Sequence, residues 1–110
     1  MDAALRAIAE PRRREILRLV RDGELPAGAI AAHFAVTRPA ISQHLRVLKE
    51  AGLVNERRDG TRRLYRARPE TLAELRIFLE DMWDDSLDRL KAAAEREQRT
   101  KQPTKEGDLS

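Results

Sequence analysis

The apolar residues at the start of the chain recur every three or four positions, which is the spacing of an amphipathic helix. Leu5 and Ile8 lie three residues apart and predict a short helix over residues 3–9. Pro11 suits the first turn of a second helix, because the backbone N–H that proline lacks has no helical partner there. The apolar positions that follow continue this second helix to about Asp22. The chain is therefore expected to begin with two short helices.

Two more helices are predicted in the middle of the chain. An apolar pair four residues apart indicates a helix over residues 27–34, although Gly28 weakens it. A short connection leads to the next helix, residues 37–51, which Thr37 can cap at its N-terminus. Gly52 supplies the left-handed conformation that often ends a helix. Two helices joined by a tight connection form the unit that presents a recognition helix to DNA.

The pattern then changes from helical to strand-like. Two extended segments, residues 53–58 and 62–67, flank Asp59-Gly60, a dipeptide typical of tight hairpin turns. From Pro69 onward, leucines return at helical spacing and predict a long helix to about Arg99. The expected fold class is mainly α with a small β-hairpin: a winged helix-turn-helix of about five helices plus a two-stranded wing.

The length and the composition of the tail define the expected domains. A chain of 110 residues is expected to form a single domain. Residues 1–99 would hold the winged helix-turn-helix, with its DNA-binding and dimerisation surfaces. Residues 100–110 are polar and contain proline and glycine, so this tail is expected to be disordered.

The helix at 37–51 separates into two arcs when successive residues are placed about 100° apart. Ile41, Leu45 and Leu48 share an arc that can pack on a core. In the DNA major groove, Arg can bridge guanine O6 and N7, Gln can pair with adenine, and Ser can serve either base. DNA binding is therefore assigned to the cap and the polar arc: Thr37, Arg38, Pro39, Ser42, Gln43, Arg46 and Lys49. The alternative is an ordinary amphipathic surface helix.

Arginines are concentrated in the predicted hairpin, where residues 57–68 contain six of them against Asp59 alone. Arginine on a β-ribbon can reach phosphate oxygens or enter a minor groove. DNA binding is therefore also assigned to Arg57, Arg58, Arg62 and Arg63. Alternation along a strand sends Arg62 and Arg66 to one side and Arg63 to the other. The alternative is an edge strand that positive charge protects from aggregation.

The net charge of +3 hides an asymmetry between the two parts of the chain. Residues 1–70 hold 15 Lys and Arg against 9 Asp and Glu, whereas residues 71–110 hold 7 against 10. A basic first part followed by a neutral-to-acidic second part suits a protein that faces a polyanion. The alternative is scattered charge that only keeps the protein in solution.

Several classes of function lack the residues that they need. The absence of cysteine excludes disulfides, thiol catalysis and Cys-based metal sites. Without a glycine-rich phosphate loop or a convincing Ser/His/Asp grouping, the protein is not expected to be an enzyme. No apolar stretch is long enough for a signal peptide or a membrane span, so a cytoplasmic protein without a membrane partner is expected.

Two groups of polar residues are candidate metal ligands. His44 lies beside the apolar arc and is expected to be a packed histidine rather than a base reader or a metal ligand, and His33 a surface residue. Carboxylates that could bind a hard cation cluster on the last helix: Glu80, Asp81, Asp84, Asp85 and Asp88. A solvated face, or pairing with arginines of a second subunit, is the favoured interpretation. No metal site and no cofactor are expected.

These motifs resemble one known family. The phrase TRPAISQHLRVLKEAGLV, followed by RRDGTRRLYRA, is similar to the recognition helix and wing of the ArsR/SmtB family of bacterial repressors. The phrases AEPRRREILRLV and LPAGAIAAHFAV resemble the second and third helices of that family, so the resemblance covers roughly residues 3–95. It implies a homodimer that binds double-stranded DNA at an imperfect palindromic operator and blocks transcription.

The resemblance also implies that the first and last helices form the dimer interface. The residues that would carry this role are Leu5, Ile8, Leu75, Leu79, Met82 and Trp83. The alternative is that the apolar stripe of the last helix only covers the core of its own subunit.

The inducer is expected to differ from the metal ions that many family members sense. Such members sense metals through cysteines on the third helix or histidines on the last, and this sequence has neither. The signal would be an unknown small molecule, a partner protein or the concentration of the regulator itself. A protein-interaction module without DNA binding, and a sensor with a metal or small-molecule site outside the family pattern, are the alternative functions.

Overall fold

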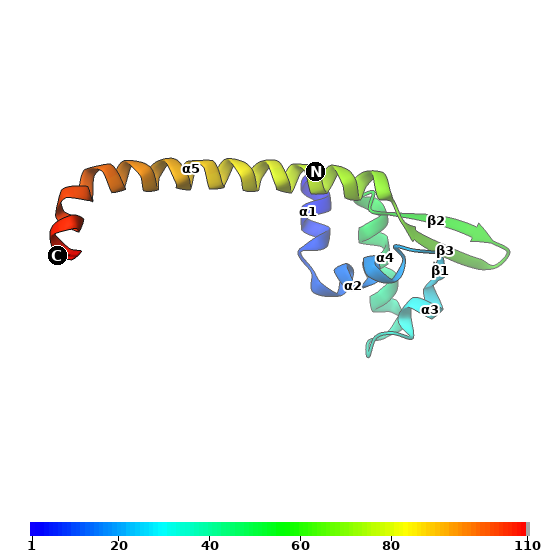
Figure 1. The fold of residues 1–110 in the computed structure, drawn as a ribbon. Helices are drawn as coiled ribbons and strands as arrows, with labels where there is room; N and C mark the ends of the chain where they lie inside the picture. The colour runs from blue at the N-terminus through cyan, green and yellow to red at the C-terminus, as the bar shows by residue number, and fades with distance from the viewer. Residues whose placement is uncertain (110) are drawn as a thin grey trace. The chain divides into compact units, whose positions relative to one another are not determined.

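The computed structural model describes residues 1–99 with their side chains and follows the backbone to residue 109. The chain forms two units, Met1–Arg76 and Ile77–Ser110. The helices are α1 (Asp2–Ile8), α2 (Pro11–Leu19), α3 (Ala27–Ala31), α4 (Arg38–Glu50) and α5 (Pro69–Leu109), as labelled in Figure 1. The strands are β1 (Leu25–Pro26), β2 (Val54–Asp59) and β3 (Arg62–Ala67). This order confirms the predicted winged helix-turn-helix, with one strand more than expected.

The hydrophobic core of the first unit gathers around α4. Ile41, Leu45 and Leu48 are at most 1% exposed, which confirms the predicted apolar arc of this helix. The helix contacts α1, α2, α3 and β2, so its apolar side is enclosed by elements from both sides of it in the sequence. Because protein interiors are close-packed, this enclosure fixes the direction in which the opposite, polar side of α4 points.

Local chemistry sets both ends of α4, as the sequence predicts. The Thr37 hydroxyl accepts a hydrogen bond from the backbone N–H of Ala40 at 3.3 Å, which makes Thr37 the N-cap. Pro39 lies in the first turn, where a missing backbone donor breaks no helical bond. Gly52 follows the last turn with a φ of 76°, a conformation that costs glycine little.

The two helices before α4 end earlier than predicted. α2 ends at Leu19, because the next residue, Val20, leaves the helical conformation with φ −101° and ψ 9°. The Val20 carbonyl accepts a hydrogen bond at 3.0 Å from the Ala67 N–H, at the end of β3, so the chain is tied to the sheet at this point. α3 is followed by a tighter turn, in which the N–H groups of residues 33 and 34 bond to carbonyls three positions back at 3.1 Å.

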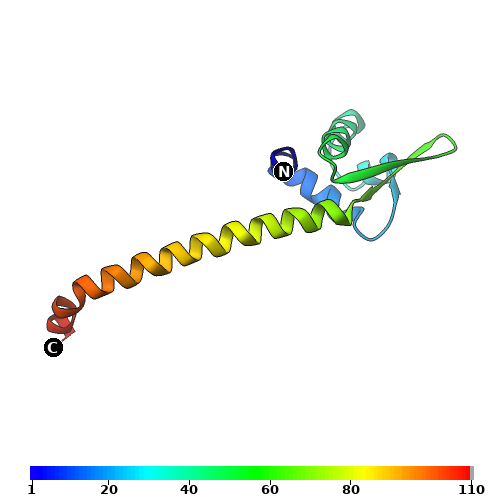
Figure 2. The same ribbon diagram turned by 90° about the horizontal axis from the view of Figure 1, so that it is seen from above.

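β2 and β3 form the predicted wing, a hairpin that extends away from the helices of the first unit (Figure 2). Asp59 pairs with Arg62, so the two turn residues are Gly60 and Thr61 rather than Asp59-Gly60. Gly60 takes the first central position with a φ of 65°. Glycine is favoured there in two-residue hairpin loops, because the position needs a positive φ.

β1 is the strand that the sequence did not predict. It pairs antiparallel with β3, Leu25 opposite Tyr65 and Pro26 opposite Leu64, and gives the sheet order β1-β3-β2. A strand of two residues shows no alternation, and its proline argues against a strand except at a sheet edge. The pairing ties the segment before α3 to the hairpin.

The register separates the hairpin into an inner and an outer face, because residues directly opposite each other in antiparallel strands point the same way. The inner face carries Val54, Glu56, Arg58, Arg63, Tyr65 and Ala67, and the outer face carries Asn55, Arg57, Asp59, Arg62, Leu64 and Arg66. Val54, Tyr65 and Ala67 are buried in the core, which identifies the inner face. Arg62 and Arg66 therefore share one face and Arg63 lies on the other, as predicted.

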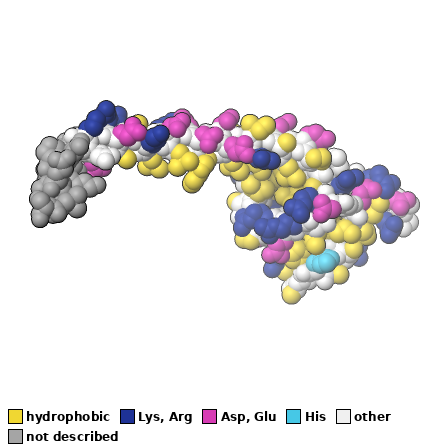
Figure 3. Space-filling model, in the orientation of Figure 1, with side chains coloured by type: hydrophobic (Ala, Val, Ile, Leu, Met, Phe, Trp, Pro, Cys, Tyr) yellow, Lys and Arg dark blue, Asp and Glu magenta, His cyan; other side chains and the backbone are white. Residues whose placement is uncertain are grey.

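α5 differs in the two units. In the first unit, Leu75 is buried. In the second unit, large apolar side chains stay exposed along the helix between charged ones (Figure 3): Ile77, Phe78, Leu79, Met82, Trp83, Leu87 and Leu90. The predicted disorder of residues 100–110 lies outside the fully described residues and stays a prediction.

Candidate nucleic-acid interface

One concave surface of the first unit lies between α4 and the hairpin, and we call it the basic groove. α4 contributes Arg38, Pro39, Ser42, Gln43, Arg46 and Lys49 to its lining. The hairpin contributes Glu56, Thr61, Arg62, Arg63 and Tyr65, and the start of α3 closes one end with Pro26, Ala27 and Gly28. Helix and wing, which are separate in the sequence, therefore meet in one surface.

Most of the residues assigned to DNA from the sequence line this groove. All six from the polar arc of α4 are present, together with Arg62 and Arg63 of the wing. Thr37, Arg57 and Arg58 are the assigned residues that do not line it. Thr37 caps α4, and Arg58 is exposed beside the groove, opposite Arg63 in the hairpin register.

The groove-facing side chains of α4 are exposed, and several keep their full hydrogen-bonding capacity. Ser42, Gln43 and Arg46 are exposed on the side of the helix opposite the buried arc. Among the fully described residues, no carboxylate forms an ion pair with Arg38 or Arg46. The guanidinium groups on this helix are therefore available for an external acceptor.

Arg38 lies close to the backbone of α3. A Cβ added to Gly28 would meet the Arg38 guanidinium at 3.6 Å, so the two residues are in close contact across the groove end. The Arg38 guanidinium therefore lies against the start of α3, while its backbone begins α4. A helix N-terminus favours anions through its unpaired N–H groups.

Glu56, an acidic residue that no sequence motif identifies, also lines the groove. The Glu56 carboxylate accepts a hydrogen bond from the Tyr65 hydroxyl at 2.9 Å and lies 3.6 Å from the Lys49 ammonium. Burial raises the pKa of Tyr65, and the bond to Glu56 raises it further. This connection ties the end of α4 to the inner face of the hairpin, and it engages Lys49 within the protein.

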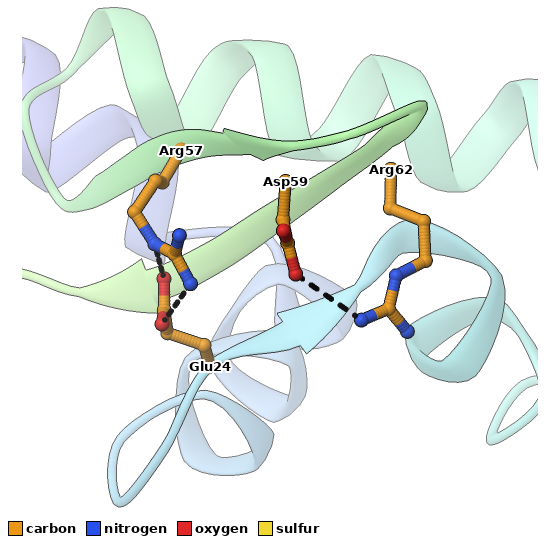
Figure 4. A network of polar contacts seen from close by, with 4 residues as sticks. All are labelled: Glu24, Arg57, Asp59 and Arg62. Atoms are coloured by element: carbon orange, nitrogen blue, oxygen red, sulfur yellow. Dashed lines mark hydrogen bonds and ion pairs between the residues drawn. The ribbon is translucent and has the colours of Figure 1, made fainter.

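Two wing arginines have acidic partners on the outer face of the hairpin (Figure 4). Arg57 donates from Nε and Nη2 to the two carboxylate oxygens of Glu24, both at 2.9 Å. Arg62 lies 3.5 Å from Asp59, its partner in the register. The expectation that Arg57 faces DNA is therefore not supported by its position, because a carboxylate far from it in sequence holds its guanidinium outside the groove.

His44 lies at the edge of the buried arc of α4 and does not line the groove. Burial lowers the pKa of His44, the charges of Arg13 and Arg12 lower it too, and Glu10 opposes them. This position agrees with the predicted packed histidine. His33 is exposed, as expected.

The residues assigned to a dimer interface fall into two groups. Leu5 and Ile8 of α1 are half-buried, and Leu75 is only 5% exposed. Leu75 therefore packs mainly within its own subunit, against its assignment to a partner surface. In the second unit, Leu79, Met82 and Trp83 are 41%, 53% and 65% exposed, so these three residues offer apolar surface.

The fully described residues offer neither a cluster of metal ligands nor a membrane-spanning helix. They contain no group of three or more His, Asp or Glu side chains arranged to hold a metal ion. No helix in this part of the chain combines the length and the apolar character needed to cross a membrane.

Comparison with known proteins gives relatives along most of the chain. Residues 10–56 match the family described as "Bacterial regulatory protein, arsR family". The chain is 45% identical over 86 residues to HTH-type transcriptional regulator Rv2034 of Mycobacterium tuberculosis, covering 78% of this chain and 80% of that protein. It is 43% identical over 60 residues to transcriptional repressor SdpR of Bacillus subtilis, covering 54% of this chain and 67% of that protein.

Solved structures show the same fold. A crystal structure described as a "Possible transcriptional regulator for arsenical resistance" has 50% sequence identity and a TM-score of 0.72, covering 84% of this chain and 95% of the other. The homodimeric winged helix-turn-helix DNA-binding domain of Mb0332 from Mycobacterium bovis has 36% identity and a TM-score of 0.62, covering 76% of this chain and 78% of that one. With its fold, its groove and these relatives, the chain belongs to the ArsR family of bacterial transcriptional regulators.

Proposed function

We propose that this regulator binds double-stranded DNA as a homodimer and represses transcription. In this proposal α4 enters the major groove and the wing lies against the neighbouring backbone. The observation that carries it is the basic groove, in which the exposed polar side of α4 lies beside two wing arginines. A recognition helix flanked by a basic hairpin matches both the width of the major groove and the charge of the phosphates.

Three side chains of α4 have the chemistry to read base edges. Arg46 can bridge O6 and N7 of guanine, because no carboxylate among the fully described residues engages its guanidinium. Gln43 can pair with adenine N6 and N7, and Ser42 can donate to or accept from either base. Sequence specificity is therefore assigned to the middle of α4.

Other groove residues are suited to phosphate. Arg63 has no acidic partner among the fully described residues, and Arg38 lies at the N-terminus of α4, where anions are favoured. Arg58, Arg62 and Lys49 are expected to add to the general attraction, the last two after exchanging a protein carboxylate for a phosphate. Contacts of this kind set affinity and register but carry little sequence information.

The homodimer is supported by the exposed apolar side of α5. Monomeric proteins rarely leave a row of large apolar side chains in water, and Leu79, Met82 and Trp83 form such a row. The related Mb0332 domain is described as homodimeric. Two copies related by two-fold symmetry would present two α4 helices to successive major grooves, which predicts an imperfect palindrome as the operator.

Repression follows from where such a dimer would lie. A protein that occupies an operator within a promoter excludes the polymerase, and the relative SdpR is named a repressor. The inducer would be a small molecule or a partner protein, without a bound cofactor. Because the DNA of bacteria lies in the cytoplasm, the proposal places the regulator there.

A binding assay on the chain's own promoter region tests the proposal. We expect a discrete complex with specific DNA that survives an excess of unrelated duplex. Arg46→Ala should weaken specific binding by about 1–3 kcal/mol, because a bidentate guanine contact is lost. Arg18→Ala is the matched control, since Arg18 is exposed on α2 and does not line the groove. Equal effects of the two changes would refute the assigned orientation of α4.

A further inference from the structure

We propose that the Glu24–Arg57 pair is a strap that holds the wing at the angle needed to touch DNA, and that Arg57 is a positioning residue rather than a DNA contact. The inference rests on the proposed function, because the angle of the wing matters only if the wing meets the duplex. It also gives a role to Glu24, an acidic residue close to a surface that should attract phosphate.

The pair crosses the whole width of the sheet. The strand order is β1-β3-β2, so Arg57 on β2 and the segment before β1 lie on opposite sides of β3. Glu24 directly precedes β1, and its carboxylate meets Nε and Nη2 of Arg57 in a fork of two bonds, both 2.9 Å long (Figure 4). Bidentate bonds of this kind fix direction as well as distance.

Leu64 shows that the strap is part of the packing of the hairpin. Leu64 is 6% exposed, yet it points to the outer face and does not belong to the main core. In the register it lies between Arg57 on one neighbouring strand and Pro26 on the other. Arginine side chains cover apolar surface with their methylene stems. Arg57 therefore lies where its methylene stem can shield Leu64 on the outer face of the hairpin.

A second connection works on the opposite face of the same strand. Glu56, the residue before Arg57, joins Tyr65 at 2.9 Å and Lys49 at 3.6 Å on the inner face. Consecutive residues of β2 thus tie the hairpin to the end of α4 on one side and to the segment before α3 on the other. Beyond them the hairpin continues to its turn at Gly60 without a described ion pair to the helices. A small change in the angle of the hairpin at Arg57 produces a larger displacement at its tip, which lies roughly 10 Å away at 3.3 Å per residue.

The Glu24–Arg57 pair is suited to fixing the orientation of the wing more than to stabilising the fold. Both side chains are partly exposed, and exposed ion pairs contribute little to the stability of folding. The hydrogen bond from Arg57 lowers the pKa of Glu24, so the carboxylate is ionised at neutral pH. Loss of the strap should therefore leave the first unit folded but widen the range of wing orientations.

Glu24→Gln separates a strap from a DNA contact by the sign of the effect. If Arg57 were a DNA contact that Glu24 holds back, the substitution would free it and tighten binding. If the pair is a strap, binding should weaken roughly threefold to tenfold, the worth of about one phosphate contact, and the slope of log affinity against log salt should fall by about 1. Asp22→Asn is the matched control: it removes a nearby exposed charge, paired with Arg21, and should not weaken binding.

An exchange of the partners adds a rescue test. Arg57→Glu alone should weaken binding, and Glu24→Arg combined with it should recover part of the affinity, because the bridge can form in reverse. If Arg57 were a DNA contact, the effects of Arg57→Glu and Glu24→Arg should simply add, because a new arginine strengthens the attraction for phosphate in either background. Absence of any recovery beyond that sum, together with tighter binding by Glu24→Gln, would overturn the proposal.

A distance measurement keeps this inference separate from the proposed function. The sequence has no cysteine, so spin labels attach only at Thr61→Cys on the wing tip and Glu50→Cys at the end of α4, and dilution of the labelled protein with unlabelled protein isolates the distance within one subunit. Glu24→Gln should broaden the distribution of that distance without DNA, and Asp22→Asn should not. An unchanged distribution refutes the strap even if DNA is bound, whereas lack of DNA binding by the unsubstituted protein refutes the proposed function alone.

Discussion

α4 and the part of α5 beyond Ile77 are both amphipathic, but their apolar sides meet different surroundings. In α4 the apolar arc is at most 1% exposed, and the polar arc faces the basic groove. In α5 the apolar side chains Leu79, Met82 and Trp83 remain 41–65% exposed in the single chain. The same amphipathic pattern in a sequence can thus describe a helix whose apolar side is buried within its own chain or one whose apolar side stays exposed.

The difference teaches how the two helices can be used. A helix whose apolar side is fully enclosed is held rigidly, and such support is what a recognition surface needs to keep its side chains in register with base edges. An exposed apolar side gains free energy only when a second surface covers it. We therefore assign recognition to α4 and association to α5, and the following experiments test that division.

The largest effect is expected from loss of packing under α4. Leu45→Ala should lower the free energy of unfolding by about 2–5 kcal/mol, because a buried leucine leaves a cavity. Leu90→Ala on α5 is the control, since Leu90 is 66% exposed and its loss should cost about 0.5 kcal/mol or less in the monomer. Urea unfolding at low protein concentration measures both. Equal losses would remove the contrast between the two helices.

Association should depend on one side of α5 and not on the other. Leu79→Glu should raise the dissociation constant of the dimer at least about tenfold, because each subunit would bury a charge in place of an apolar group. Ile77→Glu makes a comparable change about 160° around the helix and should leave the dimer intact. Sedimentation velocity at several concentrations distinguishes the two. A dimer that tolerates Leu79→Glu would mean that α5 associates through another face.

The contribution of α4 to specific DNA binding can be measured separately from that of the wing. Arg62→Ala together with Arg63→Ala should weaken binding to specific and unrelated DNA alike and reduce the salt slope by about 1–2. Arg46→Ala should instead act mainly on specific DNA. Titrations of both duplexes at several salt concentrations give the slopes. If the wing double variant lost specific binding only, the wing and not α4 alone would read sequence.

The smallest effect is expected for His44, at the edge of the buried arc of α4, and concerns the pH dependence of folding stability. Burial lowers the pKa of His44 below 6.5, so the unfolded chain takes up this proton at higher pH than the folded one does. Stability should therefore fall slightly as the pH drops from above 6.5 into the range between the two pKa values. His44→Gln should remove this part of the pH dependence, measured as urea midpoints, while His33→Gln at an exposed site should keep it.

α4 was predictable because its determinants are local. Thr37, Gly52 and the spacing of Ile41, Leu45 and Leu48 act within a few turns of the same helix, and each was found where the sequence placed it. The polar arc then follows from geometry, because its residues must face away from the buried side. For this reason six groove residues on α4 could be named before the fold was known.

The determinants that the sequence did not predict are long-range. Glu24 and Arg57 are 33 positions apart, and nothing in the local pattern pairs them. β1 has two residues and gains its strand character only from β3. The Val20 carbonyl, directly after the end of α2, accepts a hydrogen bond from the N–H of Ala67, a partner far along the chain. For Leu75, spacing identified an apolar position but could not tell burial within the chain from burial by a partner.

The bond from the Ala67 N–H to the Val20 carbonyl also bears on how the chain can be divided. β3 supplies Tyr65 and Ala67 to the core and carries the pairing of both other strands, so the helices before it are not a complete structural unit. A fragment that stops at the turn of the hairpin would lack β3, and its hydrophobic core would be left incomplete. The segment that matches the family, residues 10–56, accordingly depends for its packing on residues further along the polypeptide.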